Sequence, residues 1–283
     1  MRSTRITAVV AGAVMMAGLT ACNGGNGSGG TSSDAAGEKK SPLDVALASL
    51  KTAARQTDGK KSAKVEGTVK NGPSNQTMKG ALDWSQGMRM NVDITQSGQS
   101  PMAGKPMKAI YTPDAMFMNM GAAGMPVAGK NWVKYDYDAL AKKMGPTGAL
   151  LKDQMQNNNP TRAMELMIAS GKVKEVGKED VRGVQATHFT GTLSVQELTR
   201  MQSKNLSEAD LKALEAQMEQ AGSKAETIDL WISSDNLLVK KRERMDSSAA
   251  SFDSTVFYSD YGTKVTAEEP PAGDTVDFEK VSQ

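Results

Sequence analysis

The chain has very few of the residues on which common catalytic and metal sites depend. Of its 283 residues, one is a cysteine and one a histidine. With Cys22 alone, no intramolecular disulfide can form, so the core must hold by side-chain packing. With His188 alone, HExxH zinc sites and histidine clusters are excluded, and no G-x-S-x-G motif accompanies it. We therefore predict a protein that is not an enzyme, binds no metal or other cofactor, and uses His188 as a structural residue.

Aromatic residues are also scarce, at 3 Trp, 5 Tyr and 5 Phe, whereas Met occurs 19 times. The 32 acidic residues leave a glycosidase-like carboxylate pair open as an alternative, although the aromatic platforms that often bind sugars are few. Methionine is flexible and polarizable, so its abundance indicates an irregular or adaptable apolar surface.

The charge balance gives no basic excess. Removal of an N-terminal leader with Arg2 and Arg5 would reduce the 34 basic residues to 32, equal to the acidic ones. This argues against a nucleic-acid partner and against strong electrostatic attraction to anionic lipid. After the leader, no run approaches the roughly 18 apolar residues of a spanning helix.

The N-terminus has the layout of a secretory signal, with Arg2 and Arg5 ahead of an apolar stretch over 6–19. Its ending, Leu19-Thr20-Ala21-Cys22, resembles the bacterial lipobox. That resemblance implies a signal peptide over 1–21, a diacylglyceryl group on Cys22, and a lipid-anchored protein on the outer face of the cell membrane. A signal peptide with a chance cysteine is the alternative. The Gly/Ser-rich composition of 22–41 predicts a flexible tether, and the lipobox resemblance implies that this tether is lipidated at Cys22.

Apolar spacing predicts alternating blocks of strands and helices after the tether. Ser41, Pro42 and Asp44 form a capping-box pattern that opens a helix. Period-2 alternation predicts strands over 63–70 and 88–95, with a turn at Ser85–Gly87. Further strands are expected over 109–111, 115–120, 131–135, 172–178, 184–190, 226–233, 237–245 and 252–261. Further helices are expected over 136–144, 147–156 and 160–171, in a short segment after Ser194, and over 207–222. Such sequential blocks favour an α+β fold, with an antiparallel sheet and helices on one face.

Three local stretches carry a wider resemblance, together with the lipobox and the order of elements. They are 131–136, 183–189, and 230–232 leading into 238–240. The chain is similar to the LppX/LprG-type lipoproteins of actinobacteria, with a LolA-like fold. The resemblance implies a curved antiparallel sheet, or half-barrel, whose concave face is covered by helices, in a domain over 42–283 that includes a short C-terminal tail. It also implies an apolar cavity that holds acyl lipids or glycolipids, and an envelope transport protein as a further partner.

Apolar residues on predicted inward faces are the candidates for such a cavity. They are Met88, Met90, Val92, Ile94, Met116, Met118, Leu140, Met144, Leu151, Met155, Met164 and Met167. Three interpretations stay open: ordinary core packing, a pliable lining for acyl chains, or a thioether site for Cu(I). The corresponding functions are an envelope sensor or scaffold, a lipid carrier, and a metal chaperone. Residues 124–130 resemble most of a phosphate-binding loop, but Asn131 and a strand follow, so we expect a plain loop.

Overall fold

The computed structural model describes residues 40–281, except 101, 158, 203–207, 221, 246 and 248–250. The predicted signal peptide, Cys22 and the predicted tether up to residue 39 lie outside the described residues. The predicted capping box opens the first helix, α1 (Pro42–Lys60): the Ser41 hydroxyl accepts from the Asp44 amide at 3.1 Å, and the Asp44 carboxylate accepts from the Ser41 amide at 3.3 Å. These bonds satisfy amides that a helix start leaves unpaired.

One twelve-stranded sheet forms the body of the described residues. Its strands are β1 (Ser62–Asn71), β2 (Ser74–Asp83), β3 (Arg89–Gly98), β4 (Pro106–Tyr111), β5 (Ala115–Asn119), β6 (Trp132–Asp136), β7 (Lys174–Val181), β8 (Val184–Ser194), β9 (Ala225–Ser233), β10 (Leu238–Met245), β11 (Phe252–Ser259) and β12 (Thr275–Asp277). Their order is β12-β6-β5-β4-β3-β2-β1-β11-β10-β9-β8-β7, and every neighbouring pair is antiparallel except β12 with β6.

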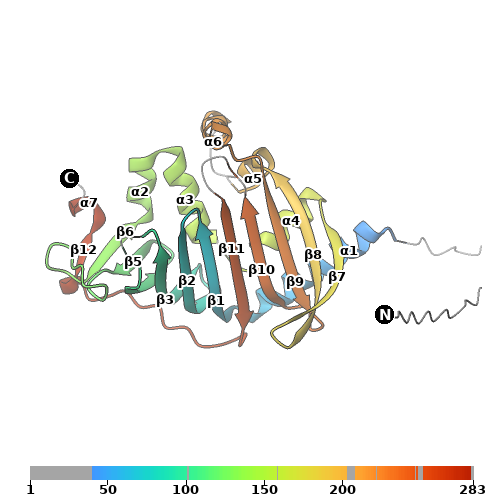
Figure 1. Cartoon of the computed structure of the whole chain (residues 1–283), viewed down its shortest axis with the longest axis horizontal. Helices are drawn as coiled ribbons and strands as arrows, with labels where there is room; N and C mark the ends of the chain where they lie inside the picture. Colours follow the sequence, from blue (N-terminus) through green and yellow to red (C-terminus); the bar gives the residue numbers. More distant parts are fainter. Residues whose placement is uncertain are drawn as a thin grey trace, which may run out of the picture. The chain divides into compact units, whose positions relative to one another are not determined.

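The helices gather on one face of this curved sheet (Figure 1). They are α2 (Tyr137–Met144), α3 (Pro146–Asn157), α4 (Arg162–Ser170), α5 (Val195–Gln202), α6 (Glu208–Gln220) and the short α7 (Phe278–Val281). Helices α1, α4 and α5 contact strands among β7–β10, whereas α2 contacts β6, and α3 packs on α2, α5 and α6. The predicted α+β class, with a curved antiparallel sheet and helices on one face, is confirmed.

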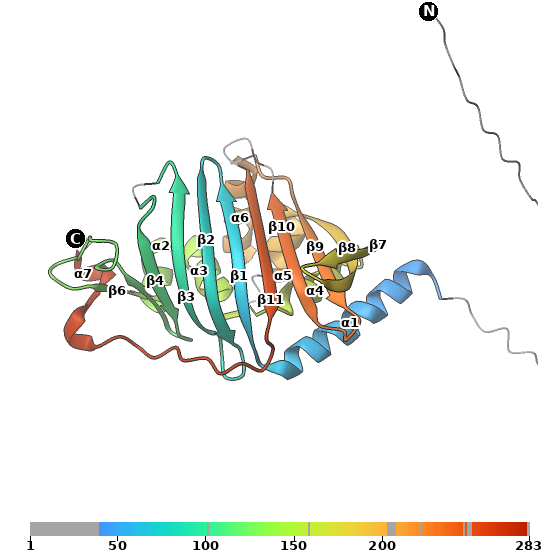
Figure 2. The same cartoon turned by 60° about the horizontal axis from the view of Figure 1, so that its bottom comes forward.

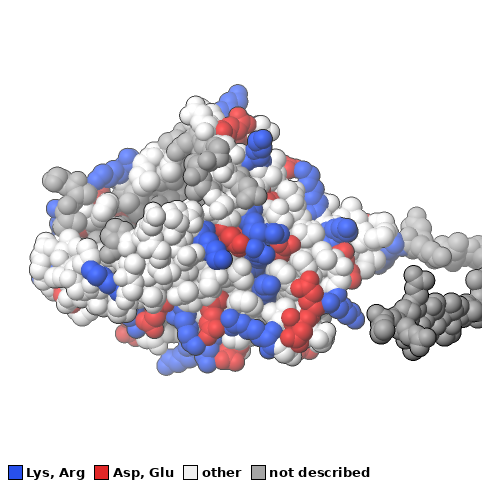
Figure 3. Space-filling model, viewed as in Figure 1, with Lys and Arg blue, Asp and Glu red and all other residues white. Residues whose placement is uncertain are grey.

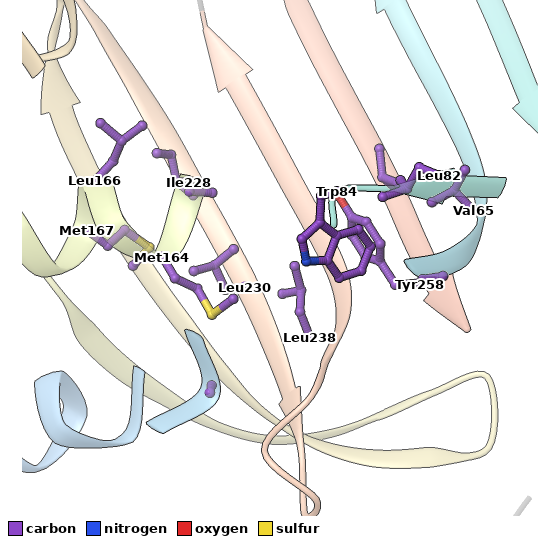
Figure 4. Packing of buried hydrophobic residues seen from close by; sticks show 14 of the residues in the cluster. Val65, Leu82, Trp84, Met164, Leu166, Met167, Ile228, Leu230, Leu238 and Tyr258 are labelled. Carbon is purple, nitrogen blue, oxygen red and sulfur yellow. The ribbon is translucent and has the colours of Figure 1, made fainter. Parts of the chain in front are cut away.

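A cluster of fully buried side chains lies between α1, α4 and strands β9 and β10. Met164 and Met167 of α4 have no exposed surface and face Leu230 of β9 (Figure 4). Leu50 of α1 and Leu238 of β10 are also fully buried in this cluster. This half of the helix-covered face is therefore an ordinary close-packed core.

The C-terminal segment differs from the prediction, in which the strand over 252–261 was the last. After β11 the chain runs along one end of the sheet, past the ends of β1, β2 and β3, and adds β12 beside β6 (Figure 2). Asn91 donates to the Thr266 carbonyl at 2.8 Å, and Asp274 accepts from the Asn131 amide and side chain at 2.9–3.0 Å. We call residues 262–277 the C-terminal strap. A three-residue strand held mainly by distant partners carries no periodicity that a sequence reading could detect.

Candidate functional site

The helix-covered face of β3–β6 carries a line of apolar and aromatic side chains. The strand register sets Met90 opposite Tyr111, Tyr111 opposite Met116, and Met116 opposite Tyr135. We call these four residues the Met–Tyr row. Since side chains two apart on a strand share a face, the row points to the same side as Val92, which belongs to the main core.

The Met–Tyr row is only half-buried, in contrast to its neighbours. All four of its residues keep intermediate exposure. One step along the strands, Val92, Ala109 and Val133 are at most 2% exposed. The side chains of the row are thus incompletely covered, although helices lie over this face of the sheet.

An open pocket of about 350 Å³ adjoins the row where α2, β6 and α7 meet. Tyr135, Ala139, Leu140 and Phe278 supply its apolar wall, and the Tyr135 and Phe278 rings stack with centroids 4.9 Å apart. Charged residues supply the rest of the lining: Lys134, Asp136, Asp138, Lys142, Lys143, Asp277 and Glu279. Burial raises the pKa of Tyr135, which marks its hydroxyl as partly desolvated. The pocket therefore joins an apolar row to a charged rim.

The residues predicted to bind lipid do not line one cavity. They form three groups that differ in burial. Met88, Val92, Ile94, Met164 and Met167 are buried in the main core. Met90, Met116, Met118, Leu140, Leu151 and Met155 are half-buried, and Leu140 lines the pocket. Met144 is 46% exposed. The half-buried group is the one whose surroundings fit a ligand, and its lipid-binding role stays a prediction.

Three aromatic residues of this region are absent from the predicted set. Tyr111 and Tyr135 could have been found from alternation, because each lies two residues from a buried partner, Ala109 and Val133 respectively. Phe278 could not, since its position depends on the pairing of β12 with β6.

The same sheet face carries an ionic cluster on β9 and β10, also absent from the predicted set. Lys241 is 8% exposed, and its Nζ lies 2.9 Å from Oε1 of Glu243. Glu226 is 9% exposed. Burial and then the charge of Glu243 raise the pKa of Glu226 to about 7, while the charge of Lys241 acts in the opposite sense. Alternation with the buried Ile228 on β9 was the available signal, since it places Glu226 on the inner face.

His188 lies on the opposite, outer face of the sheet, where both ring nitrogens and the ring face have contacts. Its Nδ1 is 2.8 Å from Glu179 and its Nε2 is 3.0 Å from Asp229, and its ring stacks on Trp231 with centroids 4.2 Å apart. Lys240 lies 3.7 Å from the other face of the same Trp231 ring. Figure 3 shows basic and acidic side chains side by side over this part of the molecule. Both ring nitrogens are occupied by carboxylates, so the arrangement fits a structural network.

Among the described residues, neither the loop that resembles a phosphate-binding motif nor any metal-ligand group forms a recognisable site. Residues 124–130 form a loop that leads into β6 and not into a helix. No group of three or more His, Cys, Asp or Glu among the described residues is placed to hold a metal ion. None of the described helices is long and apolar enough to cross a membrane.

Comparison with known proteins identifies relatives in Streptomyces. No family model matches the chain. A Streptomyces griseus protein, an "Uncharacterized 31.2 kDa protein in rplA-rplJ intergenic region", is 43% identical over 245 residues, which cover 83% of this chain and 80% of that protein. A Streptomyces coelicolor protein, "Putative lipoprotein SCO4650", is 31% identical over 304 residues, which cover 98% and 95% respectively.

Among solved structures, the lipoprotein LppX of Mycobacterium tuberculosis has a TM-score of 0.48 at 13% identity, covering 79% of this chain and 98% of LppX. LprF of Mycobacterium bovis has a TM-score of 0.46 at 17% identity, covering 82% and 99%. By its identity to the two Streptomyces proteins over most of their lengths, the chain belongs to their family, one member of which is named as a lipoprotein.

Proposed function

We propose that the protein is a non-enzymatic, lipid-anchored lipoprotein of the bacterial envelope that binds acyl lipids or glycolipids. The anchor rests on Cys22 after Leu19-Thr20-Ala21 and on the lipoprotein named among its relatives. Such an anchor would hold the protein at the outer face of the cell membrane. Two or more acyl chains hold a protein there stably, whereas a single chain binds only marginally.

The Met–Tyr row is the observation that carries lipid binding. A filled core buries its apolar side chains, as the α4 side of this sheet does. Met90, Tyr111 and Met116 instead keep exposed surface on the helix-covered face. An acyl chain lying along the row between β3–β6 and helices α2 and α3 would cover them, and each CH₂ so buried contributes about 0.8 kcal/mol.

The alternative is an envelope sensor or scaffold of the same fold that acts through protein contacts. The close-packed α1 and α4 side favours it, because Leu50, Met164 and Met167 leave no room for a ligand there. The two functions differ in whether the β3–β6 side takes up lipid.

Direct binding of a fluorescent C18 fatty acid tests the proposal. The full chain carrying Cys22→Ala would be titrated with the fatty acid, so that no anchor lipid competes. We expect saturable binding that weakens at least 10-fold in Met116→Arg, because a guanidinium placed against an acyl chain is left unpaired and desolvated.

Met125→Arg is the matched control, since Met125 is 39% exposed in the loop before β6 and lies away from the row. It should bind like the parent chain. Circular dichroism must show both variants folded. Absence of saturable binding by the parent chain, or unchanged binding by a folded Met116→Arg variant, would favour the scaffold function.

A further inference from the structure

Tyr137, the first residue of α2, borders the Met–Tyr row on the side of the turn between β4 and β5. It follows Tyr135 by two residues, and its amide donates to the carbonyl of Asp114 in that turn at 3.0 Å. Tyr111, the last residue of β4, precedes the same turn. The Gln156 side chain of α3 also donates to a carbonyl of the turn, at 3.0 Å. This edge of the row therefore lies against the start of α2 and is covered by α3.

The side chain of Tyr137 is buried, but its hydroxyl has no hydrogen-bonding partner. The residue is 2% exposed, and none of the residues that the structure describes forms a hydrogen bond with the hydroxyl. Among the described residues, one other fully buried side-chain nitrogen or oxygen shares this state, Nε of Arg244, and that guanidinium already bonds Asp229 at 2.7 Å. Because a buried tyrosine hydroxyl usually finds a partner, an unpaired one indicates a place where a ligand can supply it.

This hydroxyl lies near the Met–Tyr row and not in the packed core. Burial raises the pKa of Tyr137, and the charges that Tyr111 and then Asp114 would carry raise it further. Such an effect requires that the groups lie close together, so the hydroxyls of Tyr137 and Tyr111 share one region. Tyr137 does not belong to the main core cluster, whereas Tyr111 packs against the edge of that cluster. The unpaired hydroxyl is therefore within reach of a ligand that covers the row.

The surroundings of the hydroxyl favour one kind of ligand group. A phenol hydroxyl can donate to an acceptor that a ligand brings. In an esterified lipid, the carbonyl oxygen is such an acceptor, and the acyl chain begins directly beside it, as the apolar row begins directly beside Tyr137. Burial and the nearby carboxylate of Asp114 disfavour a further negative charge. A neutral ester carbonyl therefore suits this position better than a carboxylate or a phosphate.

We propose that the Tyr137 hydroxyl donates a hydrogen bond to the ester carbonyl of the bound lipid and so fixes where the acyl chain enters the Met–Tyr row. The inference rests on the proposed lipid-binding function and narrows its ligand class to lipids whose chains are held by ester bonds. Tyr137 is then a specificity-determining residue, because a chain in ether linkage offers no carbonyl to its hydroxyl.

Two probes that differ in a single carbonyl group test this contact. Methyl palmitate carries an ester carbonyl, and hexadecyl methyl ether has a CH₂ group in its place. Each would displace the fluorescent fatty acid from the full chain with Cys22→Ala, with or without Tyr137→Phe, after the fatty acid alone has been titrated against each chain. We expect Tyr137→Phe to weaken methyl palmitate at least about 5-fold and the ether less than about 2-fold, because only the ester loses a hydrogen bond to its carbonyl.

Tyr261→Phe is the matched control, because the Tyr261 hydroxyl already donates to the Leu238 carbonyl beside the packed half of the sheet. It should change the affinity for neither probe and should lower stability in urea unfolding. Tyr137→Phe loses no hydrogen bond within the protein, so it should not lower stability. Equal effects of Tyr137→Phe on both probes, or a clear loss of stability in that variant, would overturn the contact and leave the proposed function standing. Failure of the parent chain to bind the fatty acid would overturn both.

Discussion

At the scale of single residues, the most unusual feature is the buried carboxyl group of Glu226. Glu226 keeps 9% of its surface exposed, and its pKa is raised to about 7, by burial first and then by Glu243. Residues on the same face of β9, such as Ile228, have no exposed surface. The sequence alternation of β9 fixes this inward direction, but only the register with β10 brings Glu226 near Lys241 and Glu243.

The raised pKa predicts a pH-dependent effect of Glu226→Gln. Because the folded-state pKa lies above the ordinary value of 4.5, the contribution of Glu226 to stability is full below pH 4.5 and is lost as the pH rises through about 7. The wild-type carboxyl thus costs up to about 3 kcal/mol above that range. We expect Glu226→Gln to be more stable than wild type at pH 8, with a smaller difference at pH 5, in urea unfolding.

Glu175→Gln serves as the control at an exposed position and should show no pH-dependent difference. An equal change in the free energy of unfolding for Glu226→Gln at pH 5 and pH 8 would contradict the raised pKa.

Residue type and spacing did not separate core methionines from half-buried ones. Met90 and Val92 share a strand face, so alternation treats them alike, yet Val92 is 1% exposed and Met90 is half-buried. The difference arises from where α2, α3 and α4 lie over the sheet. That placement depends on contacts between elements distant in sequence, which a local pattern does not record.

At the scale of elements, local signals predicted most of the helices and strands. The capping box at Ser41 and Asp44 fixed the start of α1, and Gly87, with φ +81°, occupies the predicted turn before β3. One element that they did not predict was β12, a short strand whose pairing partner β6 is distant in sequence. Strands of this kind are specified by tertiary hydrogen bonds, here those between Asn131 and Asp274.

Those hydrogen bonds predict that Asp274→Ala loosens the C-terminal strap. Removing the carboxylate deletes every bond it accepts from Asn131. We expect amide hydrogen exchange over 272–281 to accelerate about 10-fold or more, with little change in β1 and β11, since local opening needs only local bonds to break. Asp235→Ala, in the turn between β9 and β10, should leave exchange over 272–281 unchanged. Unaltered exchange in Asp274→Ala would show that the strap is held by other contacts.

At the scale of the whole molecule, the α+β class followed from blocks of strands and helices, without any single decisive motif. The curvature of the sheet and the helix-covered concave face came from the resemblance to LppX/LprG-type lipoproteins. The asymmetry between a packed α4 side and an incompletely covered α2–α3 side could not be predicted, because it depends on how helices distant in sequence pack over the sheet. The candidate site depends on that asymmetry.

The membrane anchor makes a prediction for the entire chain. Cys22 is the one thiol available for a diacylglyceryl group. In an actinobacterial host, Cys22→Ala should abolish incorporation of labelled palmitate and move the protein from the membrane fraction to the medium. Ser28→Ala, in the predicted tether, is the control and should keep the label. Undiminished labelling of the Cys22→Ala chain would refute the anchor.

The C-terminal strap also bears on the order in which the sheet is finished during synthesis. β6 is complete at Asp136, but its edge partner does not exist until Thr275–Asp277 has been made. Until then the outer edge is unpaired, and Ile110 and Phe117 lack the cover of Ala267. Open edges beside apolar surface promote association between chains. A chain interrupted before Thr275 would therefore contain all the earlier strands but expose the unpaired edge of β6. We expect such a chain to associate with other chains through that edge.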